Sequence, residues 1–173
     1  VGGSVSRAGG REVDNVAAWD GQSWGALEDA ECLHQKRSVC GISGRVLAMA
    51  TVGEYLYVGG MFDMAGGKPA SNVARFYSGV WEPLGAGVDG PVTVMGTMRV
   101  LGSQSGSCVY VAGEFNVAED LTGETETGGL ARWCVGDPVL VQTVGNRVVS
   151  EFWQAVAVPE GVRAIRTMVA HPR

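Results

Sequence analysis

Two short glycine-rich segments match the sequence motifs of a catalytic site and of a nucleotide-binding site. Residues 21–25, GQSWG, match the G-x-S-x-G pattern, in which a serine nucleophile lies on a sharp turn between a strand and a helix. Residues 85–90, GAGVDG, match the G-x-G-x-x-G pattern, which places a pyrophosphate at a helix N-terminus. In both cases a strand pattern follows instead of a helical one. We therefore expect no catalytic residue and no cofactor.

Side chains that could bind a metal ion occur in two places. Cys32, His34 and Cys40 are three soft ligands, but no fourth ligand is evident and their spacing matches no common zinc pattern. An acidic loop at 118–129 could bind Ca²⁺ through the carboxylates of Glu119, Asp120, Glu124 and Glu126. An ordinary solvated loop is the favoured alternative for that segment. With only two histidines in the chain, general-base chemistry also has few candidates.

The elements that position these residues are copies of one repeat, which is most complete at residues 55–85. Its glycine pair, its Asn-Val-Ala run and its last tryptophan recur 57 residues earlier, at 1–3, 15–17 and Trp24. Its glycine-ended strand and its aromatic strand recur again at 111–113 and 130–133. A period near fifty with paired glycines and spaced aromatics is typical of propeller repeats. Short β-rich runs separated by Gly, Pro, Ser and Asn predict four strands in each unit.

The repeat therefore predicts an all-β protein of β-propeller type, with about three four-stranded blades in one domain. We expect a partial blade at 1–27, an insertion at 28–44, blades at 45–85 and 91–144, and terminal strands at 151–169. The insertion is polar and is expected to be a surface excursion. The third copy lacks the second tryptophan of the repeat, and its last strand is assigned to residues 139–144. Three blades cannot close a ring, so we expect further blades outside this chain, several chains in one assembly, or an open stack.

A disulfide is expected in the third copy. Cys108 opens the strand that ends at Gly113, and Cys134 closes the strand that begins near Gly129. If these strands pair antiparallel with Gly113 opposite Gly129, Cys108 falls opposite Cys134. The same two positions of the second copy hold tyrosines, at Tyr55 and Tyr77, which predicts a cross-strand aromatic pair there.

A second disulfide, between Cys32 and Cys40, could close a small loop in the insertion. Free thiols are the alternative for both pairs. Two disulfides favour an oxidising, extracellular or lumenal setting. A net charge of −5 provides no electrostatic footprint for nucleic acid, and no apolar run approaches the length of a membrane span.

The double glycine, followed by an aromatic residue and a tryptophan five positions later, resembles kelch-type propeller repeats. The fuller pattern V-G-G-x-F-x-x-A-G-G…N-V-A-R-F…W-x-P-L-G, at residues 58–85, is similar to the repeats of extracellular galactose-oxidase-like propellers, including Rax2-type fungal surface proteins. The resemblance implies four-stranded blades whose tips and loops bind partners. The copper site and the Cys–Tyr cross-link of the oxidase have no counterpart among these residues.

These observations predict a non-catalytic, extracellular or cell-surface module with a structural or protein-interaction role. Its expected partners are other protein chains or the remaining blades of the same protein. The first alternative is a carbohydrate-binding or carbohydrate-oxidising propeller, in which exposed tryptophans stack on glycans. An intracellular kelch adaptor is the second alternative, and four free cysteines would favour it. A shared fold licenses no catalytic assignment by itself.

Overall fold

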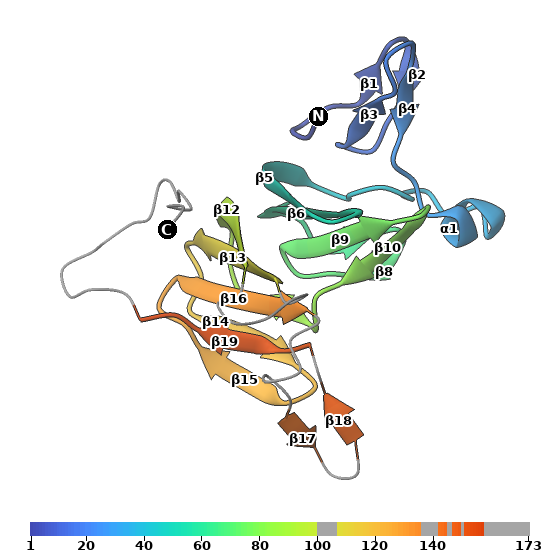
Figure 1. The fold of residues 1–173 in the computed structure, drawn as a ribbon. Coiled ribbons are helices and arrows are strands. Elements are labelled where there is room, and N and C mark those ends of the chain that lie inside the picture. Colours follow the sequence, from blue (N-terminus) through green and yellow to red (C-terminus); the bar gives the residue numbers. More distant parts are fainter. Residues whose placement is uncertain (100–106, 136–141, 145–146, 150, 158–173) are drawn as a thin grey trace.

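The computed structural model describes residues 1–99, 107–135, 142–144, 147–149 and 151–157. In these residues the protein is all-β apart from one short helix, α1 (Ala30–His34) (Figure 1). Two four-stranded antiparallel sheets form most of the structure, and an N-terminal pair of β-hairpins precedes them. The helix of this described part is too short to cross a bilayer.

The first large sheet, called sheet 1, is an up-and-down meander in the order β5-β6-β9-β10. Its strands are β5 (Arg45–Val52), β6 (Tyr55–Met61), β9 (Val73–Tyr77) and β10 (Val80–Pro83). Side chains alternate between its two faces, as the pleat of a strand requires. One face carries Tyr57, Arg75 and Glu82, which are paired across neighbouring strands, and the other carries Phe76 and Trp81. We call these the Tyr–Arg face and the Trp face.

Sheet 2 repeats the same meander, in the order β12-β13-β16-β19. Its strands are β12 (Val92–Arg99), β13 (Ser107–Gly113), β16 (Leu130–Val135) and β19 (Trp153–Ala155). Its Tyr–Arg face carries Tyr110, Arg132 and Gln154, and its Trp face carries Trp133 and Trp153.

The fourth strand of sheet 2 differs from the sequence prediction. It is formed by β19, and Trp153 pairs with Trp133 as Trp81 pairs with Phe76 in sheet 1. The second tryptophan of the repeat is therefore present in the third copy, displaced along the chain by an insertion. Within the predicted strand at 139–144, β17 (Gln142–Val144) pairs instead with β18 (Arg147–Val149), and residues 139–141 lie outside the described residues. The predicted terminal strand at 162–169 also lies outside them.

The N-terminal hairpins are β1 (Arg7–Ala8) with β2 (Arg11–Glu12) and β3 (Ala17–Trp19) with β4 (Trp24–Ala26). Trp19 pairs with Trp24, the same arrangement as Phe76 with Trp81. The β3–β4 hairpin is therefore the counterpart of the β9–β10 hairpin, one repeat earlier. Figure 1 shows this hairpin, sheet 1 and sheet 2 following one another through the molecule.

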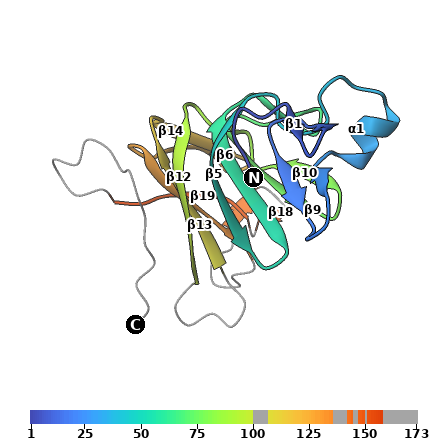
Figure 2. The same ribbon diagram turned by 90° about the horizontal axis from the view of Figure 1, so that it is seen from above.

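Packing between the units divides the core into two clusters. The Trp face of sheet 1 packs with Val16, Ile42 and Val46, and the Tyr–Arg face of sheet 1 packs against the Trp face of sheet 2. Seen from above, β12 lies beside β5 and β6 (Figure 2). A Cβ atom at Gly59 would lie 2.5 Å from Val92, so this glycine allows the two sheets to approach closely.

The asparagine of the repeat has a structural role at each junction. Asn15 and Asn72 both have a left-handed backbone, with φ of 64° and 65°. The side-chain amide of Asn15 donates to the Ile42 carbonyl at 2.8 Å, and that of Asn72 donates to the Val88 carbonyl at 3.0 Å. Asparagine tolerates this backbone conformation better than most residues, which explains its place in the Asn-Val-Ala run.

Candidate functional site

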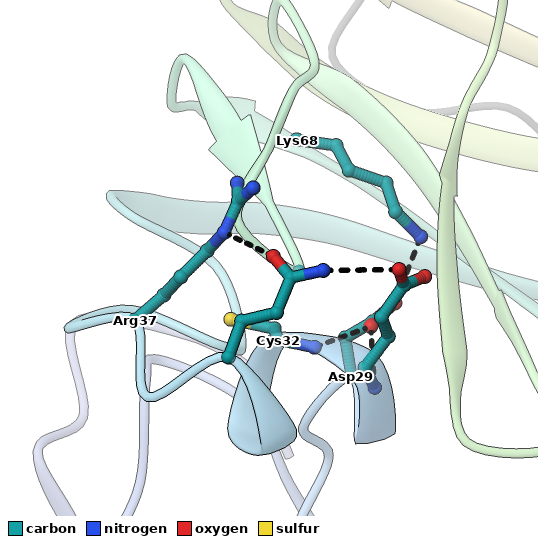
Figure 3. Close-up of a pocket in the computed structure, with 7 residues that line it drawn as sticks. Asp29, Cys32, Arg37 and Lys68 are labelled. Carbon is teal, nitrogen blue, oxygen red and sulfur yellow. Dashed lines mark hydrogen bonds and ion pairs between the residues drawn. The ribbon is translucent and has the colours of Figure 1, made fainter.

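A surface depression lies where α1 meets the hairpin of β7 (Met64–Ala65) and β8 (Lys68–Pro69) (Figure 3). It has a cavity volume of about 70 Å³ and is lined by Asp29, Glu31, Cys32, Gln35, Arg37, Gly66 and Lys68. Ligand pockets usually enclose 300–1,000 Å³, so this depression is small for a substrate site. Its polar groups are also engaged with one another, as the contacts of Asp29 show.

Asp29 is the most buried charged side chain in the described residues, at 1% exposure. One carboxylate oxygen caps α1 by accepting from the backbone N–H groups of Glu31 and Cys32, both at 3.1 Å. The other accepts from the Trp81 backbone N–H at 2.9 Å and from Lys68 Nζ at 3.0 Å. Burial alone would raise the pKa of Asp29, but the N–H groups of Trp81 and Cys32 together with Lys68 outweigh it and hold the pKa below its usual value.

This arrangement attaches the insertion to sheet 1. Lys68 also donates to the Trp81 carbonyl at 3.1 Å, and Arg37 donates to the carbonyl of Gly67. The predicted surface excursion at 28–44 is thus partly a buried element, with Ile42 at 0% exposure. Because the carboxylate of Asp29 is fully bonded to protein donors, the depression supports a structural role better than a catalytic one.

The cysteines form the two pairs predicted from the sequence. Cys32 and Cys40 are bonded, with Cα atoms 5.4 Å apart, and Cys108 and Cys134 are bonded directly across β13 and β16. Because Cys32 and Cys40 are in a disulfide, they cannot act with His34 as thiolate ligands of a metal ion. Among the described residues, no group of three or more His, Cys, Asp or Glu side chains is placed to share a metal ion.

The tyrosine pair of the second repeat is also present. Tyr55 and Tyr77 stack with ring centroids 4.8 Å apart, at the positions that the disulfide occupies in sheet 2. The Arg75 guanidinium lies 5.1 Å from the centroid of the Tyr55 ring. Two different cross-strand pairs therefore link the same two strands in successive repeats.

The predicted acidic loop is instead a β-hairpin, formed by β14 (Val117–Asp120) and β15 (Gly123–Glu126). It joins β11 (Gly87–Val88) in a three-stranded sheet. Glu119 and Glu124 are paired across the hairpin, and both are exposed, as is Glu126. These three glutamates share the exposed face of the hairpin.

Asp120, the fourth Ca²⁺ candidate, lies on the opposite side of this hairpin. Its carboxylate accepts from the Trp153 backbone N–H and from the backbone and hydroxyl of Thr122. Asp120 therefore bonds the tryptophan backbone of sheet 2, as Asp29 does in sheet 1. The alternation of a two-stranded ribbon separates it from the three glutamates.

The two glycine motifs lie at turns of the repeat. Ser23 ends the turn between β3 and β4, and its hydroxyl donates to Asp20 at 3.0 Å. Two backbone N–H groups and this hydroxyl lower the pKa of Asp20. Residues 85–90 pass through β11 into β12, so no helix follows the glycines. A Cβ atom at Gly87 would lie 2.1 Å from the Ser71 carbonyl, which explains the glycine without a nucleotide.

A polar cluster crosses the junction between sheets 1 and 2. Arg75 donates to Glu82 of its own sheet at 2.8 Å and to Glu151, just before β19, at 2.9 Å. The Arg75 side chain is only 14% exposed, and the two carboxylates raise its pKa against the opposing effect of burial. Tyr57 beside it is fully buried. An arginine at this depth needs such partners, so the cluster fixes how the sheets meet.

The same indole–carbonyl bond occurs at two junctions. Trp81 Nε1 donates to the Leu27 carbonyl at 2.9 Å, and Trp153 Nε1 donates to the Leu84 carbonyl at 3.1 Å. In each case the acceptor lies three residues after the tryptophan of the preceding unit. Each unit is therefore joined to its predecessor in the same way.

Comparisons with protein-family models, curated proteins and solved structures find no match to this chain. The class that the structure itself defines is an all-β repeat protein with two disulfides. The sequence did not single out Asp29, Arg75 or Glu151, and it singled out Asp120 only as a Ca²⁺ candidate. Only the repeat alignment carried a signal for one of them, since Arg75 and Arg132 occupy the same position of successive copies.

Proposed function

We propose that the chain is part of a kelch-type, galactose-oxidase-like β-propeller and acts as a non-catalytic structural or protein-interaction module outside the cell or on its surface. The observation that carries this proposal is the repeated junction. The two four-stranded meanders pack Trp face on Tyr–Arg face, and an indole–carbonyl bond occurs both at this junction and at the junction of sheet 1 with the N-terminal hairpin. Stacked units of this kind provide a rigid scaffold whose loops and faces bind partners.

The contacts of the deeply placed charged side chains and the two disulfides support the same proposal. Two deeply placed charged side chains, Asp29 and Arg75, are bonded to protein groups and hold structural elements together. The two disulfides fit an oxidising setting, in which structural disulfides persist. The expected partners are other protein chains or further units of the same fold.

One observation favours the carbohydrate-binding alternative. Trp19 is 52% exposed, and its ring lies 5.4 Å from that of Trp24 at an angle of 51°. Exposed indoles of this kind can stack on the apolar face of a sugar ring. In that case the N-terminal hairpin, and not the depression beside α1, would be the binding surface.

A glycan-array screen and metal analysis of the purified protein would separate the two functions. The interaction-module proposal predicts no glycan bound more tightly than about 1 mM and no stoichiometric copper. Sugar binding that disappears in Trp19→Ala, with Leu121→Ala as an exposed apolar control, would establish the carbohydrate reading. Stoichiometric copper would overturn the non-catalytic proposal.

A further inference from the structure

The two ends of the described stack present complementary faces. Sheet 2 leaves its Tyr–Arg face directed away from sheet 1, because its Trp face packs on sheet 1. Tyr110, Arg132 and Gln154 on that face are all partly exposed, whereas the corresponding Tyr57 of sheet 1 is fully buried by its neighbour. At the other end, the β3–β4 hairpin leaves its Trp face with Trp19 exposed.

We propose that a second copy of this chain binds head to tail, placing the Trp face of its β3–β4 hairpin on the Tyr–Arg face of sheet 2. This inference rests on the proposed function and specifies the partner. The contact continues the packing of sheet 2 on sheet 1 and the indole–carbonyl bond that the chain forms at two junctions within itself. Since the two surfaces differ, the association is heterologous, and it either closes a ring or extends into a filament.

The first argument is the position of the backbone acceptor. Leu27 and Leu84, each three residues after a tryptophan, accept the indole N–H of the following unit. Val156 lies three residues after Trp153, and no contact between described residues occupies its carbonyl oxygen. Trp24 of a second copy holds the position of Trp81 and Trp153 and can donate to it.

The second argument is the matching of side chains at the junctions. Arg75 is met by Glu151, which lies two residues before Trp153. At the preceding junction the corresponding positions are Ala18 and Gly79, and neither has a side chain that needs a partner. At the junction where one unit carries an arginine, the next unit therefore carries an acceptor for it.

Arg132 presents the same requirement on sheet 2. It donates to Gln154 at 2.7 Å, as Arg75 donates to Glu82 within sheet 1, and it also donates to the Tyr110 hydroxyl at 3.4 Å. The residue two positions before Trp24 is Gln22, which is exposed in the β3–β4 turn. Its side-chain carbonyl can accept from Arg132 of the neighbouring copy, in the role that Glu151 has toward Arg75.

Sedimentation velocity over a concentration series, up to about 100 μM so that a weak specific interface is populated, tests this proposal. The unmodified chain is expected to sediment above the mass of one copy as concentration rises. Arg132→Glu removes the donor, and Gln22→Arg places two cations together, so each is expected to weaken self-association by about tenfold or more. Arg45→Glu, on an exposed strand residue away from both faces, is the matched control and is expected to have no effect.

Mixing the two single variants gives the decisive result. In a head-to-tail contact the mixture of Arg132→Glu and Gln22→Arg regains association, because the new glutamate of one variant contacts the new arginine of the other. A double variant that carries both substitutions is expected to associate by itself for the same reason. Gln22 is an exposed turn residue, so its substitution leaves the fold intact and keeps the test valid if Arg132→Glu folds poorly. A chain that stays monomeric throughout, or variants that mixing does not rescue, would overturn the inference. The interaction-module proposal would survive that result, because the glycan and copper assays test it separately.

Discussion

The contacts of Asp29 predict that its removal destabilises the protein by several kilocalories per mole. Asp29→Ala removes the cap of α1, which costs about 1 kcal/mol. It also leaves the buried Trp81 backbone N–H without an acceptor, which costs about 1–3 kcal/mol. The Lys68 side chain is 38% exposed, so its ion pair adds little. The expected loss in the free energy of unfolding is therefore about 2–4 kcal/mol at neutral pH.

The pH dependence of this loss follows from the pKa of Asp29. Its pKa is lowered in the folded protein from an ordinary value of 3.8, so the folded state favours the carboxylate. The resulting stability is present above that ordinary pKa and is lost as pH falls through the lower folded value. The difference between the unmodified chain and Asp29→Ala should therefore be largest at neutral pH and shrink below about pH 4.

Urea unfolding followed by tryptophan fluorescence, at neutral pH and at about pH 3, measures both effects. Glu54→Ala is the control, because it removes the same charge from an exposed turn and should change stability by less than about 0.5 kcal/mol. Asp29→Asn keeps only one acceptor oxygen, which can serve either α1 or Trp81, and an intermediate loss is expected. A loss below about 1 kcal/mol, or one that does not change with pH, would refute this account of Asp29.

Two further predictions concern the junction and the disulfide of sheet 2. Trp153→Phe removes a buried hydrogen bond between the indole and the neighbouring sheet, whereas Trp133 Nε1 is buried with no hydrogen-bond partner. The free energy of unfolding should therefore fall by about 1 kcal/mol more for Trp153→Phe than for Trp133→Phe. Equal losses for the two variants in urea unfolding would contradict a stabilising role for this bond. Replacing both Cys108 and Cys134 by serine opens a link across 26 residues and should cost about 3.5 kcal/mol by the chain-entropy model. Comparing the unfolding midpoints of the serine variant and the parent, each with and without reductant, checks this value. If reductant lowers the midpoint of the serine variant as much as that of the parent, the effect of reductant belongs to the Cys32–Cys40 disulfide.

The sequence alone predicted sheet 1 well. The residues of its repeat form the four strands predicted for one unit, and the paired tyrosines stack. It also predicted the register of β13 and β16, in which Cys108 lies opposite Cys134. These features depend on the strict two-residue period of paired strands, and that period is visible in the spacing of residues along the sequence.

The fourth strand of sheet 2 could not be found in this way. Two apolar runs, at 139–144 and 152–158, are both suitable for a strand, and chain proximity favours the first. The structure uses the second, because Trp153 fills the core between the sheets at 2% exposure and bonds the Leu84 carbonyl. That choice depends on a hydrogen bond between residues 69 positions apart, which a local sequence pattern cannot predict.

By itself, the sequence determined the repeat and the all-β class and predicted the Cys108–Cys134 pair, because each follows from the spacing of residues along strands. The Cys32–Cys40 pair was suggested only by its place in the insertion. The tertiary structure decided the roles of the polar side chains. Asp29 and Asp120 come from unrelated segments, an insertion and a hairpin, yet each bonds the backbone of the tryptophan in its sheet. Such a role depends on where the folded chain places a carboxylate beside a buried N–H group, and side chains from different sequence positions can meet that requirement equally well.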